Sequence, residues 1–225
     1  MSIQTWPDWI APNSIDWWLE AQSRSGGQSI LGAERIVTSP SARWRCTMTF
    51  RIWGTQTDPG RLLTWRTLSG ALYGRSGSIL IGPFDRMTPG RLPDGCADTT
   101  FSDGETFSDG SEFTQPAGVC LVASAALQGA RALNVTYAGV GAPQSGQYFG
   151  LGGNALYLAS SVVANSDGTL SLTFSPGLRA AAAIGDAVDF ERPKATMRLM
   201  ADDGARAKLA IGGVADTTLD LVEAF

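Results

Sequence analysis

Histidine is absent from this sequence of 225 residues. Its absence removes the side chain that most often serves as a general base, as the partner of a Ser or Cys nucleophile, or as a zinc ligand. Most hydrolase and metalloenzyme mechanisms are therefore disfavoured. Acid-only chemistry of the glycosidase type survives, because it needs two positioned carboxyl groups and no imidazole.

Cysteine and long apolar runs are scarce as well. The three cysteines, Cys46, Cys96 and Cys120, are odd in number and lack CxxC spacing, so they predict neither a disulfide framework nor a zinc knuckle. No run reaches the roughly 18 apolar residues of a membrane helix, and SIQTWPDWIAPN near the start has no basic region followed by an apolar one. We expect synthesis in a reducing cytoplasm, without an export signal or membrane segment.

The sequence has no cluster of charged residues of a single sign. The 17 Lys and Arg residues are scattered among 21 Asp and Glu, and the formal net charge is −4. A nucleic-acid-binding protein needs a basic patch or stripe, so we expect no nucleic-acid binding. The 44% hydrophobic content indicates a folded chain whose length suits one large domain or two small ones.

The first part of the chain alternates between apolar and polar residues, as strands do. In residues 43–53, RWRCTMTFRIW, every second side chain is apolar, which is typical of a strand with one buried face. Residues 15–20 and 78–82 are also strand-like. Between them, Asp58 and Pro59 have the residue types of a helix N-cap and first turn, so we expect a short amphipathic helix there.

Composition changes after residue 84. Residues 85–118 are rich in Gly, Asp, Pro, Ser and Thr, which indicates a long loop or a boundary. Short strand candidates follow, starting near residues 120, 132, 147, 155, 169 and 187. Ser166-Asp167-Gly168, between two of them, predicts a hairpin turn because Gly can take the positive φ that the turn needs.

The sequence therefore predicts a mainly β protein with one short helix. We expect residues 1–84 and 195–225 to form a β-sandwich or barrel-like layer, and residues 85–118 to form a Gly- and Asp-rich loop. Residues 119–194 would be an inserted small all-β, barrel-like domain. Such an insertion is tolerated at an exposed turn, because the termini of a domain often lie close together.

Phe101, Phe107 and Phe113 recur every six residues in FSDGETFSDGSEF, with Asp and Glu between them. The acids match only fragments of a calcium-binding loop, and no flanking helices are predicted. Two Ser-Asp-Gly turns explain the spacing, since Asp caps its own backbone and Gly takes positive φ. We interpret the stretch as a loop pinned to a neighbouring subunit by its Phe side chains; a calcium site involving Asp103 and Asp109 is the alternative.

Other candidate chemistry is weaker. A carboxylate pair for glycoside hydrolysis would have to come from Asp103, Asp109, Asp186 or Glu191, and nothing in the sequence sets their separation. GLGG at residues 150–153 lies between two strand candidates and lacks the strand, loop and helix of a phosphate site. We expect no catalytic residue, no cofactor and no metal ligand.

Tryptophan is frequent, with seven in the chain. Several fall close to the start, among them Trp6, Trp9, Trp17 and Trp18. Aromatic side chains anchor protein interfaces and also form sugar-binding platforms. We interpret the tryptophans as residues of the hydrophobic core and of one interface, and take these four as candidate interface anchors. A platform for glycan binding is the alternative.

Several passages together resemble distal tail or baseplate proteins, a family of minor structural proteins of long-tailed bacteriophages. Residues 29–50, SILGAERIVTSPSARWRCTMTF, are similar to a family passage that precedes an alternating strand, and residues 72–85, LYGRSGSILIGPFD, to the run after its helix. Residues 146–203, from GQYFGLGG through DGTLSLTFSPGLR to MRLMADD, are similar to its second half. The likeness follows chain order over most of the sequence.

The resemblance implies a structural, non-enzymatic role at the tail tip of a virion. It implies a ring of identical copies that joins the tail tube and the tape-measure end to the hub. We expect a closed ring with one repeated heterologous interface, a hexamer with a trimer as the alternative. A carbohydrate-binding β-sandwich module for host attachment is the alternative function.

Overall fold

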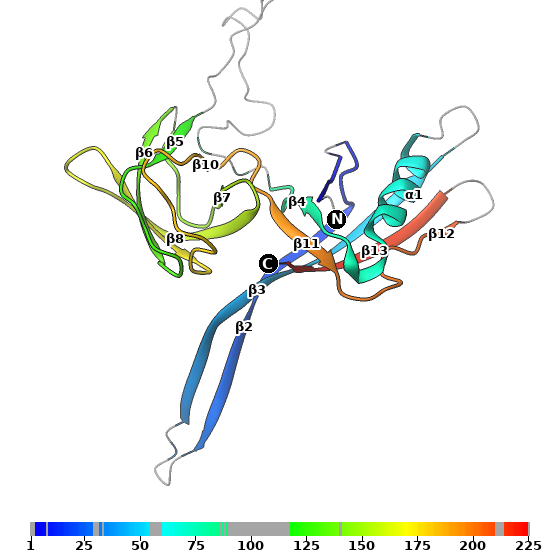
Figure 1. Cartoon of the computed structure of the whole chain (residues 1–225), viewed down its shortest axis with the longest axis horizontal. Helices are drawn as coiled ribbons and strands as arrows, with labels where there is room; N and C mark the ends of the chain where they lie inside the picture. Colours follow the sequence, from blue (N-terminus) through cyan, green and yellow to red (C-terminus); the bar gives the residue numbers. More distant parts are fainter. Residues whose placement is uncertain are drawn as a thin grey trace, which may run out of the picture. The chain divides into compact units, whose positions relative to one another are not determined.

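The computed structural model describes residues 3–7, 9–28, 32, 34–54, 60–85, 87, 89, 118–139, 141–209 and 214–224. The chain divides into two compact units. The first unit is Met1–Phe84 with Lys194–Phe225, and the inserted unit is Asp85–Pro193. Both are built mainly from strands, which confirms the predicted fold class (Figure 1). The FSDGETFSDGSEF stretch, with Phe101, Phe107, Phe113, Asp103 and Asp109, lies outside the described residues.

One mixed sheet forms the first unit. Its order is β1 (Gln4–Thr5), β4 (Ile79–Ile81), β11 (Ala195–Leu199), β13 (Val214–Glu223), β3 (Glu34–Trp53) and β2 (Ser14–Gln28), with β12 (Lys208–Leu209) beside β13. Only β1 and β4 are parallel among these pairs. The last strand, β13, therefore lies between β3 and β11, so that both parts of the unit share one sheet.

The alternation of β3 produces one buried face. Trp44, Cys46, Met48, Phe50 and Ile52 are each at most 2% exposed. Helix α1 (Gly60–Leu72) adds Trp65, Leu68 and Leu72 to this core. An aromatic cluster joins the elements, with ring centroids 4.9 Å apart for Trp6 and Phe50 and 5.4 Å for Phe50 and Trp65. The core of the first unit thus lies between the sheet and the predicted short helix.

The inserted unit is a nearly closed barrel. Its sheet order is β10 (Val188–Asp189), β7 (Tyr148–Leu151), β8 (Ala155–Ala164), β9 (Leu170–Ser175), β6 (Ala132–Ala138) and β5 (Val119–Val122). A β-bridge between Leu121 and Ala187 brings the two ends of this order together. Stacked and edge-on rings of Phe149, Tyr157 and Phe174 fill its core. The predicted hairpin turn lies between β8 and β9, with Gly168 at φ 83°.

Candidate interaction surfaces

The first candidate surface is a long extension of the β2–β3 hairpin, which we call the hairpin arm and define as residues 22–28 and 34–39. Pairing of β2 with β3 runs from Ser14 opposite Thr49 to Gln28 opposite Glu34, with register shifts between Glu20 and Gln22 and between Ser25 and Gln28. Strand β13 pairs with β3 only as far back as Arg45. The arm therefore leaves its sheet as a two-stranded ribbon (Figure 1).

Both edges of the arm are open. Strand β2 is the end of the sheet order, and β3 has no second neighbour before Arg45. Within the described part of the chain, no strand pairs with either outer edge of the arm. An open strand edge presents backbone N–H and C=O groups that another chain can pair with, so it is a template for strand addition.

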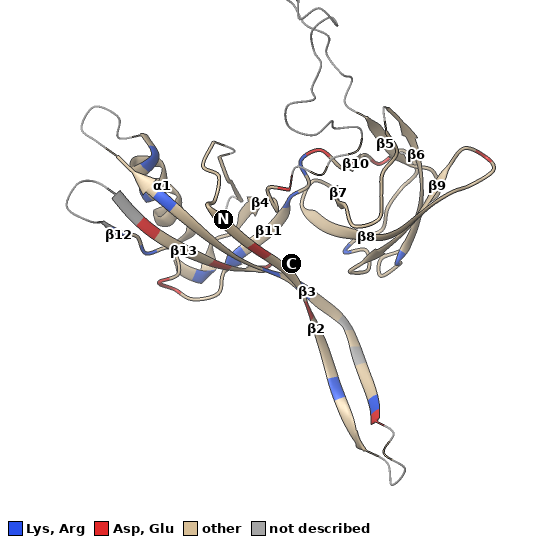
Figure 2. Cartoon of the chain, turned by 180° about the vertical axis from the view of Figure 1, so that it is seen from behind, with Lys and Arg blue, Asp and Glu red and all other residues tan. Residues whose placement is uncertain are grey.

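The arm has no core of its own. Residues 22–28 are all exposed, and Ile36 and Val37, which point to opposite faces, are each 61% exposed. Arg24, Glu34 and Arg35 place charges of both signs along it (Figure 2). An isolated two-stranded hairpin is marginally stable in water. The arm is therefore held by the pairing between its two strands and not by a core.

The tryptophans expected at an interface lie in different environments. Trp6 is 3% exposed, and its indole Nε1–H donates to the Ile10 carbonyl at 2.7 Å, so it has no exposed face to offer a partner. Trp17 is half-buried, 6.4 Å from the ring of Trp44. Trp9 is 51% exposed and Trp18 is 38% exposed. Of the four, Trp9 and Trp18 are therefore the most accessible.

Trp53, which was not among the four expected anchors, and Trp9 both lie near the guanidinium of Arg61. The Arg61 guanidinium carbon is 3.9 Å from the Trp53 ring centroid and 6.0 Å from that of Trp9. Trp53 is 42% exposed. One signal was available: Trp53 is an apolar residue on the otherwise polar face of β3. Trp and Arg are the residues most enriched among interface hot spots, so this stack is a second candidate surface.

The acids considered for catalysis serve as turn residues where the structure describes them. Asp186 is exposed and accepts a hydrogen bond from the Ala183 N–H at 2.8 Å, and Glu191 is exposed on its loop. Across the described residues, no three Asp, Glu or Cys side chains gather as a metal site would require. Burial raises the pKa of Cys120 from 9.0 to about 12, and burial, aided by Asp220, also raises that of Cys46. Both thiols are therefore poor nucleophiles.

Comparison of the chain with protein-family models found no matching family. Comparison with curated proteins found no significant match. In the part of the chain that the structure describes, no helix combines the length and apolar character needed to cross a membrane.

Proposed function

We propose that the protein is a non-catalytic structural subunit of a bacteriophage tail tip, a distal tail protein of the virion. Identical copies form a closed ring, for which a hexamer is favoured and a trimer is the alternative. The ring joins the tail tube and the tape-measure end to the hub. It requires no cofactor and binds no nucleic acid.

The hairpin arm is the observation that carries the proposal. A ring of identical subunits needs one heterologous interface, in which a surface of one copy meets a different surface of the next. A ribbon with two open edges and no core of its own supplies one half of such an interface. Its side chains are mostly polar, so its backbone groups, more than apolar burial, would provide the attraction and the register.

Shortening the arm tests this role. A variant in which a two-residue turn replaces residues 22–39 keeps the part of β2 and β3 that faces the core. We expect native mass spectrometry of the full-length protein at high concentration to show rings, and the shortened variant to remain a monomer with an unchanged melting temperature. A wild-type protein that stays monomeric both in solution and in the particle would contradict the ring.

A matched pair of variants separates the arm from general surface effects. Ile36→Ser with Val37→Ser removes two side chains, each 61% exposed, from the arm. Val163→Ser removes a similar side chain, 55% exposed, from β8 of the inserted unit. Assembly should weaken in the first variant and not in the second. Equal weakening in both would mean that exposed apolar area, and not the arm, drives association.

A carbohydrate-binding module for host attachment is the second candidate, and the exposed rings of Trp9 and Trp53 favour it. One face of Trp53 is already covered by Arg61, which leaves less aromatic surface for a sugar ring. Glycan-array binding by monomeric protein, lost in Trp9→Ala, would support this candidate over the ring. Hydrolysis of a polysaccharide or peptidoglycan by the purified protein would instead show an enzyme.

A further inference from the structure

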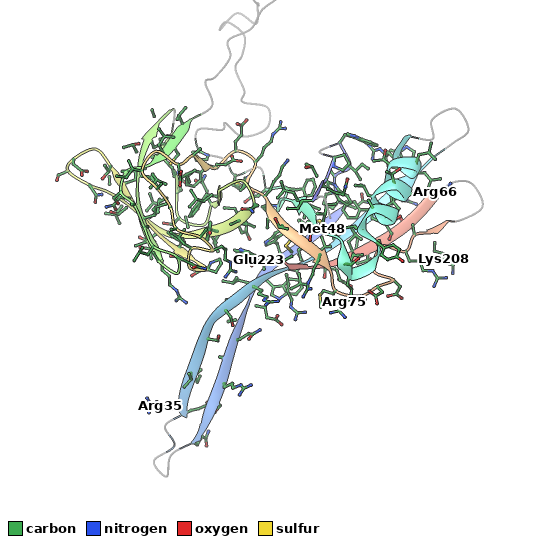
Figure 3. All side chains as sticks on the ribbon, in the orientation of Figure 1. Arg35, Met48, Arg66, Arg75, Lys208 and Glu223 are labelled. Atoms are coloured by element: carbon green, nitrogen blue, oxygen red, sulfur yellow. The ribbon has the colours of Figure 1, made fainter. Side chains whose placement is uncertain are left out.

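A pocket of about 730 Å³ lies beyond the C-terminal end of α1 in the first unit. It is lined by Tyr73, Gly74, Arg75, Ser76, Arg198 and Asp202. Tyr73, at φ 43°, and Gly74, at φ 65°, turn the chain sharply away from the helix. Arg75, which Figure 3 labels, follows in the short 3-10 turn Gly74–Ser76, and Arg198 comes from β11.

Asp202 holds this turn against the sheet. Its Oδ1 accepts a hydrogen bond from the backbone N–H of Arg75 at 3.1 Å. Gly74 has φ 65°, and a Cβ there would come within 2.9 Å of the same oxygen, so a larger residue would be strained and would displace the Asp202 side chain. Asp202 thus connects the turn that carries Arg75 to the segment after β11, the strand that carries Arg198.

Neither arginine side chain of the pocket has an anionic partner within the described residues. The Nε of Arg198 is buried and makes no hydrogen bond to the described protein atoms. A buried N–H without an acceptor costs free energy, and a guanidinium recovers most when the acceptor is an anion. Two guanidinium-bearing side chains, the half-buried Arg198 and the exposed Arg75, therefore line the pocket without an anionic partner among the described residues.

We propose that this pocket binds a single carboxylate, presented by an Asp or Glu side chain of a partner protein. The planar guanidinium fork matches the two oxygens of a carboxylate. The charge of the lining also fits: two guanidinium groups and the Asp202 carboxylate leave one net positive charge. A phosphate dianion would carry more charge than the lining balances, and Asp202 would repel it more strongly than it repels a single carboxylate. The exposed ring of Tyr73 offers an apolar surface for the methylene groups of the incoming side chain.

The test uses the ¹⁵N-labelled full chain and follows the Nε–H signals of its arginines. Arg75→Lys and Arg198→Lys assign the two signals. The probe is N-acetylglutamate α-amide, which carries one carboxylate. It is titrated at constant ionic strength, with chloride as the balancing anion. Inorganic phosphate is titrated in parallel. We expect saturable shifts of the Arg75 and Arg198 signals with the monocarboxylate, and weaker binding of phosphate.

Matched variants make the result specific. Arg198→Lys keeps a positive charge and removes the fork, so binding should weaken about tenfold or more, the equivalent of one charge-assisted hydrogen bond. Arg66→Lys, on the exposed side of α1 outside the pocket, should bind as the wild type does. Asp202→Asn keeps an Oδ1 acceptor and removes the one negative charge of the lining, so it should favour phosphate more than the monocarboxylate.

Three outcomes would overturn the proposal: no saturable shift at Arg75 or Arg198, equal affinity in the Arg198→Lys and Arg66→Lys proteins, or tighter binding of phosphate than of the monocarboxylate by the wild type. Melting temperatures of the variants show whether each is folded. If Arg198→Lys is not folded, Arg75→Lys takes its place, because Arg75 is exposed on the turn. The proposal does not depend on the ring.

Discussion

The carboxylate of Glu223 accepts a hydrogen bond from the backbone N–H of Trp44 at 3.0 Å, across 179 positions of sequence. Glu223 is 3% exposed and lies one position beyond Val222, which pairs with Arg45 (Figure 3). A buried carboxylate is tolerated only when it is hydrogen-bonded. The bond therefore ties the last strand of the chain to the middle of β3, at the base of the hairpin arm.

Replacing this carboxylate should destabilise the first unit. Glu223→Ala removes the carboxylate that accepts the hydrogen bond of the Trp44 N–H. We therefore expect the free energy of unfolding to fall by about 1–3 kcal/mol. Glu223→Gln keeps an acceptor oxygen and should lose less. Urea unfolding followed by fluorescence measures both changes. Equal stability of the Ala variant and the wild type would show that the bond contributes nothing.

Two glycines near the end of α1 should respond in opposite directions to the same change. A Cβ at Gly77 would lie 2.3 Å from the Leu72 carbonyl oxygen, to which the Gly77 N–H already donates. Gly77→Ala must move the backbone and should cost about 1–3 kcal/mol. A Cβ at Gly70, inside α1, meets nothing within 4 Å, so Gly70→Ala should stabilise by about 0.5–1 kcal/mol. Thermal unfolding of the two variants under one condition makes the comparison; shifts of the same sign would contradict it.

The buried thiol of Cys120 predicts a loss of stability in alkaline solution. Burial raises its pKa from 9.0 to about 12 in the folded protein. Between these values the unfolded chain has released the proton and the folded chain has kept it. The free energy of unfolding should therefore fall as pH rises above 9, by about 1.4 kcal/mol per pH unit for this thiol. Below pH 9 the thiol is protonated in both states, so its full contribution to the free energy of unfolding is present.

Unfolding of the inserted unit by urea between pH 8 and 10.5 measures this slope. Cys120→Ala removes the thiol and should make the decline shallower, although its stability at pH 8 is lower because of the cavity. An unchanged slope in the variant would mean that Cys120 ionises equally in both states. Cys46, in the first unit, should act in the same direction because burial and the charge of Asp220 raise its pKa.

Much of the fold was predictable because burial leaves a period in the sequence. The alternation of residues 43–53 corresponds to the core face of β3, and the short amphipathic helix expected after Asp58 and Pro59 corresponds to α1. Ser166-Asp167-Gly168 predicted its turn from backbone chemistry alone. In each case a local pattern and the packed structure have the same physical cause.

The hairpin arm was not predictable in this way. Its strands extend β2 and β3 over residues such as Ser23, Ser25 and Gly26, which have neither apolar alternation nor strand propensity. Neither face of the arm is buried, so no hydrophobic period marks it. The arm is stabilised by pairing between its two strands, and a short segment of sequence does not show which residues of the two strands pair. The Trp9, Arg61 and Trp53 stack was missed for the same reason, since three separate segments bring it together.

The last prediction follows from the change in burial along one pair of strands. In the monomer, amides of residues 22–28 and 34–39 should exchange with solvent about 100-fold faster than those around Met48, because opening the arm exposes no core. In the proposed ring, the outer edges of the arm pair with the next copy, so the same amides should become protected, whereas amides near Met48 change little. Hydrogen exchange with mass spectrometry on monomer and assembled protein measures both. Protection confined to the inserted unit on assembly would place the contact elsewhere, and arm amides already protected in the monomer would mean that the ribbon needs no partner to be stable.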